Sequence, residues 1–279
     1  MKVLNFGSLN IDLVYRVRDF VRPGETIPAL SFARFAGGKG LNQSIALARA
    51  GAPVVHAGAV GADGAFLLDV MRESGVDCSA VAVDREVPSG HAVIQVADSG
   101  ENSIVLYSGA NSRITPGLVA SALSHAEPGN ILLLQNEISS IPAIMRAAAE
   151  RHMRIFINPA PMTPMVAEYP LELVDTLIVN ETEAEALAAC RLPEQVNVLK
   201  TLGARGAVYN DTIHVPAQRV DRVVDTTAAG DTFIGYFIAE ILRGAEVLDA
   251  MTTASAASAW CIRHPGASAS IPYRRDLAL

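Results

Sequence analysis

The sequence predicts an α/β fold in which a mostly parallel central sheet carries helices on both faces. Short β-rich runs alternate with Ala- and Leu-rich helical segments along most of the chain. The length of 279 residues, half of them hydrophobic, suffices for one large α/β domain with a sizeable core. No linker, repeat or low-complexity segment divides the chain, so we expect a single domain over residues 1–279.

The predicted strands are short apolar runs bounded by turn residues, and the predicted helices have apolar residues at helical spacing. The strands are expected at residues 2–7, 54–61, 131–135, 154–159, 176–180 and 206–211. The helices are expected at residues 41–51, 66–75, 141–152 and 181–189. Strands and helices that alternate in this way are typical of parallel sheets covered on both faces.

Two stretches, residues 11–36 and 89–111, break this alternation. Both have the pattern of antiparallel β-hairpins, with Gly, Pro and Asp at the turns. We interpret them as a small β-sheet that projects from the main sheet and forms a candidate lid. The alternative is that they are ordinary edge strands of the main sheet, and the sequence alone favours neither.

Composition and charge exclude several classes of function. The net charge is −7 and the pI is about 5.4, without a basic cluster, which argues against a nucleic acid or an anionic membrane as partner. The three cysteines, Cys78, Cys190 and Cys261, show no CxxC spacing and indicate buried thiols of a reducing compartment. We therefore expect neither a disulfide framework nor a zinc site.

The N-terminal segment does not have the pattern of an export signal. Polar residues, among them Asn5, Asn10 and Asp12, interrupt the stretch that would have to be the apolar core of a signal peptide. The longest apolar runs are also far shorter than a membrane span. The sequence thus predicts a soluble, cytoplasmic protein.

A glycine-rich turn, AGGKG from Ala36, directly precedes the first predicted helix. Glycines allow close approach of a ligand to the backbone, and the N-terminus of a helix offers free N–H groups to a polar or anionic group. The spacing is neither that of a Walker A loop nor GxGxxG. Taken alone, such a turn is more often a structural element than a binding loop.

Paired polar residues follow two of the predicted strands. Asn10 and Asp12 come at the end of the first strand, share a face, and could together hold a vicinal diol; a simple turn is the alternative. Asn180 and Glu183 stand where a strand passes into a helix, so they either cap that helix or reach a hydrated Mg²⁺. Glu137 is an isolated acid at another strand end.

The segment DTTAAGDTF, residues 225–233, gives the most specific signal. Ala228, Ala229 and Gly230 are small enough for successive backbone N–H groups to converge into an anion hole at a helix N-terminus. Asp231, which is expected to open that helix, would lie beside the hole as a base. In a loose phosphoryl-transfer transition state, the position of such a carboxylate matters more than its basicity. A helix cap would explain Asp231 but not the small residues before it.

Taken together, these motifs resemble those of the ribokinase-like (PfkB-type) carbohydrate kinases. AGGKGLNQ resembles the first family signature and DTTAAGDTF the second, while GSLNID, GANSRIT, INPAP, NETEAE, TLGARG and HPGASASIP follow in the family's order. The resemblance spans roughly residues 3–272. It implies a three-layer α/β/α sandwich with a projecting β-sheet lid, and transfer of the γ-phosphoryl group of ATP to a sugar hydroxyl.

The resemblance also implies a role for each matching position. Asp231 would be the catalytic base, and the Ala228–Gly230 turn would form the anion hole, with N–H groups of Ala229 and Gly230. The sugar would be held by Asn10, Asp12, Gly38, Lys39, Asn42 and Glu137. The nucleotide and its Mg²⁺ would be held by Asn180, Glu183, Thr201, Gly203, Gly206 and Gly230, with Ser255 near the adenine.

A monovalent-cation site, usually for K⁺ in this family, is implied as well. Its ligands would come from Asp225, Thr227 and Ser270 and from backbone carbonyls near Cys261, His264 and Gly266. A cation there would fix the anion-hole loop electrostatically without touching substrate. The family also uses the projecting sheet as a dimer contact, which implies a homodimer.

The motifs GANSRIT and INPAP favour ribose over fructose or a nucleoside, and for ribose the resemblance implies phosphorylation on the 5-hydroxyl. The alternative is a kinase for another sugar or nucleoside, fructokinase-like, deoxyribokinase-like or a nucleoside kinase. The segment at residues 190–200 is shorter than the family pattern, and Ser255 replaces an asparagine that is common in the family. Both departures concern ATP binding. They leave open a non-catalytic regulator that binds sugar or nucleotide, although the retained Asp231 and glycines argue against it.

Overall fold

The computed structural model describes residues 1–187 and 192–277. Its strands are β1 Val3–Phe6, β2 Asn10–Val17, β3 Ser31–Gly37, β4 Val54–Gly61, β5 Asp77–Asp84, β6 Gly90–Ala97, β7 Asn102–Tyr107, β8 Ile131–Gln135, β9 Arg154–Asn158, β10 Thr176–Asn180, β11 Asn197–Thr201, β12 Ala207–Tyr209 and β13 Ile213–Val215. Its helices are α1 Lys39–Arg49, α2 Ala65–Glu73, α3 Pro116–Ala122, α4 Ile141–Ala149, α5 Glu181–Leu187, α6 Ala229–Leu242 and α7 Val247–Cys261. Each of the strands and helices expected from the sequence is present.

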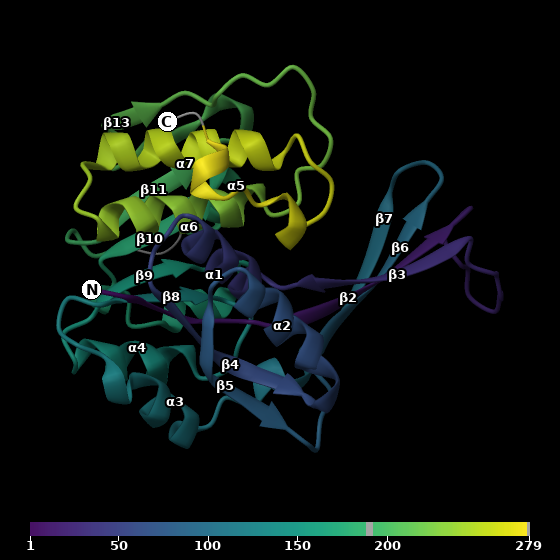
Figure 1. The fold of residues 1–279 in the computed structure, drawn as a ribbon, viewed down its shortest axis with the longest axis horizontal. Coiled ribbons are helices and arrows are strands. Elements are labelled where there is room, and N and C mark those ends of the chain that lie inside the picture. The colour runs from purple at the N-terminus through teal and green to yellow at the C-terminus, as the bar shows by residue number, and fades with distance from the viewer. Residues whose placement is uncertain (188–191, 278–279) are drawn as a thin grey trace.

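The described residues form a main sheet of nine strands in the order β13-β12-β11-β10-β9-β8-β1-β4-β5 (Figure 1). All neighbours from β11 to β5 pair in parallel, whereas β12 and β13 are antiparallel. The fold class predicted from the sequence is therefore confirmed. Because the strands are parallel, the carboxyl ends of β1, β8 and β10 lie along one edge of the sheet.

The two faces of the main sheet have separate hydrophobic cores, as the alternation of strand side chains requires. In β8, Leu133 packs into the core under α1, α2, α6 and α7. Its neighbours Leu132 and Leu134 point the other way, into the core under α3 and α4. The apolar runs of the sequence are thus strands buried on both faces, which places the helices in two layers around the sheet.

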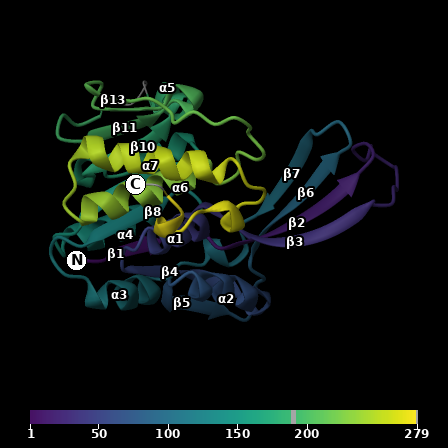
Figure 2. The same ribbon diagram turned by 45° about the horizontal axis from the view of Figure 1, so that its top comes forward.

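The second sheet has the order β3-β2-β6-β7 and stands away from the body of the molecule in both views (Figures 1 and 2). The pairs β2–β3 and β6–β7 are antiparallel hairpins, and β2 joins them by pairing in parallel with β6. Residues 11–36 and 89–111 therefore form a separate projecting sheet. The alternative, that they extend the edge of the main sheet, is wrong.

Two boundaries differ from the sequence prediction. Asn10 and Asp12 lie at the start of β2 in the projecting sheet, since β1 already ends at Phe6. Helix α6 begins at Ala229, so Asp231 is its third residue and does not open it. In the shortened segment, β11 takes its place beside β10 at residues 197–201, while residues 190 and 191 lie outside the described residues.

Candidate active site

Many of the predicted site residues, but not all, meet where the carboxyl edge of the main sheet adjoins the base of the projecting sheet. Three cavities lie there, which we name the helix-side, lid-side and outer cavities. The helix-side cavity, of about 240 Å³, is lined by Lys39, Asn158, Ala160, Ile178, Val179, Asn180, Glu183, Thr201, Thr226, Ala228, Ala229, Gly230, Asp231 and Ile234. The lid-side cavity, of about 320 Å³, is lined by Asn10, Leu106, Tyr107, Ser108, Asn111, Ser112, Asn136, Glu137, Ile138, Ser139 and Pro161.

The outer cavity, of about 840 Å³, connects the other two through shared residues. Lys39, Asn180 and Glu183 line it together with the helix-side cavity. Pro161 lines it together with the lid-side cavity. The three cavities therefore adjoin one another between the projecting sheet and the start of α6, and we call them together the cleft.

Asp231 is 9% exposed and lies in the first turn of α6. Both of its carboxylate oxygens are held by amides of α1: Asn42 Nδ2 donates to Oδ2 at 3.0 Å, and Gln43 Nε2 donates to Oδ1 at 2.9 Å. Carboxylate oxygens accept more than one hydrogen bond each, so the group can still accept another from a ligand. The result is a carboxylate of fixed orientation that faces the helix-side cavity.

The turn before Asp231 leaves backbone donors free at the same cavity. Ala228 adopts the left-handed conformation, with φ of 59°, and ends the incoming loop there. The N–H of Ala229 donates to the Thr226 carbonyl at 3.2 Å. The N–H groups of Gly230 and Asp231 have no acceptor among the described residues. The free backbone donors at this turn are therefore the N–H groups of Gly230 and Asp231, whereas the N–H of Ala229, which was expected to serve the anion hole, is used within the turn.

On the lid side, Asn10 and Asp12 lie on one face of β2, as the sequence predicted. Asn111 Nδ2 donates to Asn10 Oδ1 at 2.7 Å, which leaves the Asn10 amide group as a donor. A Cβ at Gly37 would lie 2.2 Å from the Asp12 carboxylate, and Gly38 has a φ of 96°. A side chain at Gly37 would therefore displace the Asp12 carboxylate, and the left-handed backbone at Gly38 favours glycine.

Glu137 follows β8 and connects the lid side with the N-terminus of α1. Its Oε2 accepts the Ser8 hydroxyl at 2.5 Å and the Lys39 N–H at 3.0 Å. Burial, followed by the negative charge of Glu137, raises the pKa of Asp12 to about 6. Burial also raises the pKa of Glu137, against hydrogen bonds from Ser8 and Lys39 that lower it. Two acidic side chains are therefore desolvated near the base of the projecting sheet; Glu137 lines the lid-side cavity, whereas Asp12 lines none of the three cavities.

Asn180 and Glu183 form the cap of α5 that the sequence offered as one interpretation. The Glu183 N–H donates to Asn180 Oδ1 at 2.8 Å, and the Asn180 N–H donates to Glu183 Oε2 at 2.9 Å. The second oxygen of Glu183 is not used in this reciprocal cap. Because both residues also line the helix-side cavity, capping fixes them there and does not exclude a role toward a ligand.

Of the other nucleotide-side positions, Thr201 lines the helix-side cavity, while Gly203, Gly206 and Ser255 line none of the three cavities. Gly206, with φ of 97°, closes the tight connection between β11 and β12. The Ser255 hydroxyl accepts from the N–H of Gln218 at 3.2 Å and contacts the Pro216 carbonyl at 3.4 Å. These residues shape the strand–turn–strand wall and the loop beside it.

The predicted cation-site residues gather around Asp225. Its two oxygens accept the N–H groups of Thr227 and Gly266, each at 2.9 Å. Burial acts to raise the pKa of Asp225, but these hydrogen bonds hold it below the ordinary value, so the carboxylate is ionised at neutral pH. The Ser270 hydroxyl lies 3.1 Å from the Cys261 sulfur.

Cys261 contacts this group through its thiol, which lies 3.6 Å from the Thr227 carbonyl, and His264 lies beside it, just after the end of α7. The His264 ring stacks on Trp260 at 5.1 Å, and its Nδ1 lies 2.9 Å from the Trp260 carbonyl. The Cys261 carbonyl accepts the His264 N–H at 3.0 Å. The Cys261 carbonyl therefore already accepts one hydrogen bond, and the expected role of these carbonyl groups toward a cation stays a prediction.

Several residues of the site were not singled out from the sequence. Gln43 holds Asp231, Asn111 holds Asn10, and Ser8 holds Glu137. Gln43 and Asn111 stand inside segments that were recognised as motifs, GLNQ and GAN. The available signal was their place in those motifs, but nothing in residue type or spacing distinguishes a polar group that holds another residue from one that touches ligand.

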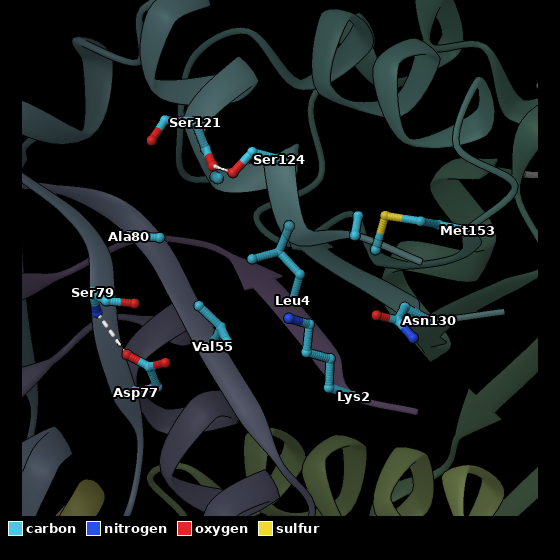
Figure 3. Close-up of a pocket in the computed structure, with 12 residues that line it drawn as sticks. Lys2, Leu4, Val55, Asp77, Ser79, Ala80, Ser121, Ser124, Asn130 and Met153 are labelled. Carbon is cyan, nitrogen blue, oxygen red and sulfur yellow. Dashed lines mark hydrogen bonds between the residues drawn. The ribbon is translucent and has the colours of Figure 1, made fainter. Parts of the chain in front are cut away.

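A further pocket, of about 260 Å³, lies at the opposite edge of the sheet (Figure 3). Lys2, Leu4 and Val55 line it near the starts of β1 and β4, and Asp77 accepts the Ser79 N–H at 2.8 Å at the start of β5. None of the predicted site residues lines this pocket. Since ligands of open parallel sheets bind at the carboxyl ends of the strands, the cleft at the other edge is the candidate active site.

Residues 1–274 match the pfkB family of carbohydrate kinases, and the chain belongs to this family. It is 35% identical to a ribokinase of Staphylococcus aureus over 99% of this chain and 98% of the relative. It is 33% identical to a ribokinase of Haemophilus influenzae over 97% of this chain and 95% of that relative. A deoxyribokinase of Salmonella typhi is 30% identical over 98% and 96%. The protein is therefore a carbohydrate kinase.

Solved structures of ribokinases also match nearly the whole chain. The structure of Arabidopsis thaliana ribokinase complexed with ribose and ATP matches with a TM-score of 0.88 and 29% identity, over 98% of this chain and 96% of that one. The ribokinase from Cryptococcus neoformans in complex with ADP matches with a TM-score of 0.85 and 34% identity, over 99% and 98%. No helix in the described ranges is both long and apolar enough to cross a membrane.

Proposed function

We propose that the protein phosphorylates the 5-hydroxyl of D-ribose with ATP. The observation that carries this proposal is the corner at the start of α6, where a fixed carboxylate adjoins two free backbone N–H groups. Asp231 would accept the proton of the sugar hydroxyl while the hydroxyl oxygen forms a bond to the γ-phosphorus of ATP; the bond from that phosphorus to the β–γ bridging oxygen breaks, and ADP leaves. The N–H groups of Gly230 and Asp231 would hold the charge on the transferred group.

The helix-side cavity fits a nucleotide triphosphate. It combines the free donors at the start of α6 with Lys39, and anions bind well at such a helix N-terminus. The unused oxygen of Glu183 is a hard ligand suited to Mg²⁺, which keeps most of its waters and also binds phosphate. When bound, the ion would neutralise charge on the phosphates, and Asn180 and Glu183 would orient its waters.

The Asp225 cluster fits a monovalent cation. It offers the ionised Asp225 carboxylate and the Ser270 hydroxyl. It also offers two carbonyl groups: the Thr227 carbonyl, which contacts the Cys261 thiol, and the Ala267 carbonyl, which accepts the Ser270 hydroxyl. These are the hard oxygen ligands that K⁺ prefers over thiol or imidazole. A cation there would stabilise the loop that ends at Ala228 without touching substrate.

Replacing Asp225 with alanine should abolish the stimulation of the enzyme by K⁺ and lower kcat about tenfold, because the loop before α6 loses its electrostatic support. The measurement is kcat as a function of KCl at constant ionic strength. Asp221→Ala, which changes an exposed aspartate of the same loop, is the matched control and should respond to K⁺ as the unchanged protein does. An unaltered K⁺ response of Asp225→Ala would contradict this cation site.

Ribose is favoured over other acceptors by two polar groups at the start of β2. The Asn10 amide offers a donor and the Asp12 carboxylate an acceptor from one face of β2, which suits a vicinal diol. The Arabidopsis relative has been seen with ribose and ATP, whereas the Salmonella relative is a deoxyribokinase. Deoxyribose lacks one hydroxyl of this diol, so it would leave one of these polar groups unpaired.

The direct test is a panel of ribose, deoxyribose, fructose and nucleosides with ATP, Mg²⁺ and K⁺, followed by release of ADP. Ribose should give the highest kcat/KM and ribose 5-phosphate as product. If deoxyribose or a nucleoside is the better acceptor, the class of reaction stands and the ribose assignment falls. If a sugar binds and no acceptor is phosphorylated at any ATP concentration, the protein is a regulator and not a kinase.

Binding of ribose should weaken at acidic pH. The pKa of Asp12 is raised to about 6, so the carboxylate that accepts the sugar hydroxyls becomes protonated below that value. With ionised Asp12 as the binding form, the dissociation constant should be about tenfold larger at pH 5 than at pH 7. Calorimetric titration without ATP measures it. Asp12→Asn should bind weakly with little pH dependence, and a wild-type constant that is equal at both pH values would rule out this role.

We further propose that residues 1–279 act as one kinase unit whose projecting sheet serves as lid and as dimer contact. The sheet exposes many large apolar side chains, which in a soluble enzyme require a cover: Phe32, Phe35, Ile104, Val105, Leu106 and Tyr107. A second copy, paired through the same sheet, would cover them. Light scattering of the purified chain tests this, and a monomeric mass at micromolar concentration would contradict it.

A further inference from the structure

A chain of buried polar side chains extends from Asp231 into the core between the main sheet and α1. Its members are buried and come from four strands and one helix: Asn5, Gln43, Ser44, His56, Gln135 and Asn158. Polar groups in such a position need a compensating hydrogen bond for each donor and acceptor. None of them has a role toward sugar or ATP in the function proposed above.

Gln43 is the member that contacts Asp231. Its Nε2 donates to Asp231 Oδ1 at 2.9 Å and also lies 3.3 Å from Asn158 Oδ1. Its Oε1 accepts from Gln135 Nε2 at 2.7 Å. Asn158 is held in turn, because its Nδ2 donates to the Ile178 carbonyl at 2.9 Å. The Gln43 side chain is 0% exposed, so solvent cannot replace any of these bonds.

The remaining members fix which way each amide points. Burial lowers the pKa of His56 to about 4, so its ring is neutral at physiological pH. The Gly7 carbonyl can only accept, so Nε2 carries the proton and Nδ1 accepts from the Ser44 hydroxyl at 2.8 Å. Ser44 Oγ then accepts from Asn5 Nδ2 at 2.7 Å, and Asn5 Oδ1 accepts from Gln135 Nε2 at 2.9 Å.

This series of oriented hydrogen bonds ends at the Asp231 carboxylate. Gln135 presents its amide group to both Asn5 and Gln43, so Gln43 must turn its carbonyl toward Gln135 and its NH₂ toward Asp231. Reversal of any one amide would bring two donors or two acceptors together inside the core. The donor that faces Asp231 is thus determined by the whole series of hydrogen bonds that begins at the Gly7 carbonyl.

We propose that Gln43 is a positioning residue for Asp231, and that Gln135 orients it. The inference depends on the proposed kinase function, because positioning is meaningful only if Asp231 receives the sugar proton. Asn42 alone would hold one oxygen and leave the carboxylate free to rotate about its Cβ–Cγ bond. Gln43 holds the other oxygen and thereby fixes the plane of the carboxylate toward the acceptor hydroxyl.

The test is Gln43→Met, which keeps the length and apolar volume of the side chain but removes both polar groups. The kcat for ribose should fall about 10- to 100-fold, while KM for ATP changes less than about threefold, because the nucleotide groups are untouched. Thr176→Val, which removes a buried hydroxyl at the far end of β10, is the control and should keep both constants.

A second comparison separates positioning from a general loss of structure. In the Asp231→Asn background, Gln43→Met should change the residual rate less than twofold, since Gln43 acts through the carboxylate. An equal loss in both backgrounds would overturn the proposal, as would an unchanged kcat in the single variant. If the unchanged protein phosphorylates no sugar at all, the proposed function fails first, so the two failures are distinguishable.

Gln135→Met keeps the proposal testable if Gln43→Met does not fold. Gln135 Oε1 is buried without a partner among the described residues, so loss of this side chain removes one unsatisfied group together with two bonds. The variant frees the Gln43 amide to turn, and kcat should fall about 3- to 10-fold at unchanged KM for ATP. A kcat equal to that of the unchanged protein would mean that Gln43 needs no orienting partner. It would overturn the proposal that Gln135 orients Gln43.

Discussion

Replacement of Asp231 by asparagine is expected to lower kcat about 10³-fold while ribose and ATP still bind within about threefold of their normal affinity. Asparagine has the same shape and can still accept one hydrogen bond, but it cannot take up the proton of the sugar hydroxyl. The free N–H groups of Gly230 and Asp231 are backbone groups and remain in place. Binding and turnover are therefore expected to separate in this variant.

The measurement combines single-turnover kinetics with calorimetric binding of each substrate. Asp249→Asn is the matched control, because Asp249 also lies in the first turn of a helix, α7, but is exposed and distant from the cleft. It should keep full activity. A residual rate of Asp231→Asn within tenfold of normal would show that another group receives the proton.

Replacement of Gly40 by alanine is expected to destabilise the fold by about 2–4 kcal/mol and to lower the melting temperature by roughly 5–10 °C. A Cβ at this position would lie 2.3 Å from the Ser8 nitrogen and 2.5 Å from the Gly7 carbonyl carbon. Backbone atoms cannot move aside as the end of a flexible side chain can. The start of α1 would have to shift away from the loop after β1.

That shift should also impair activity, since Lys39 and Asn42 are carried by the same turn of α1. Gly117→Ala is the matched control: Gly117 is a helical glycine whose added Cβ would have only the Thr115 hydroxyl nearby, at 3.9 Å. It should raise stability by about 0.5–1 kcal/mol, because alanine favours the helix. A melting temperature of Gly40→Ala equal to that of the unchanged protein would contradict the close approach.

Much of the fold was predictable because it follows from periodic patterns. The continuous apolar run of β8 is buried on both faces, and the turn residues of the two hairpin segments mark their strands. What the pattern did not decide was where those hairpins go, since an edge strand and a projecting sheet require the same alternation. Pairing of β2 with β6 across about 80 residues decides it.

Part of the candidate site was predictable for a different reason, because Asp231 and the turn before it form a motif that is local in the chain. The partners of Asp231 are not local: Gln43 is 188 residues away, and Gln135 lies 92 residues from Gln43. Neither residue type nor spacing indicates that these amides meet. The same applies to Ser8 and Glu137, which only the meeting of β1, β8 and α1 brings into contact.

Asn180 and Glu183 cap α5 and also line the helix-side cavity, so a structural role does not exclude a role toward a ligand. The reciprocal cap satisfies one oxygen of each side chain and fixes both beside the helix-side cavity. Sequence reasoning treated the cap and the ligand as alternatives. In physical terms the cap orients the side chains that would serve Mg²⁺, because a carboxylate has capacity beyond a single hydrogen bond.

The most direct test of the account is a crystal structure of the protein with ribose and a non-hydrolysable ATP analogue. We expect the ribose 5-hydroxyl within hydrogen-bond distance of the Asp231 carboxylate, and the terminal phosphate at the N–H groups of Gly230 and Asp231. A triphosphate bound away from the start of α6, or a sugar whose nearest hydroxyl does not reach Asp231, would contradict the account.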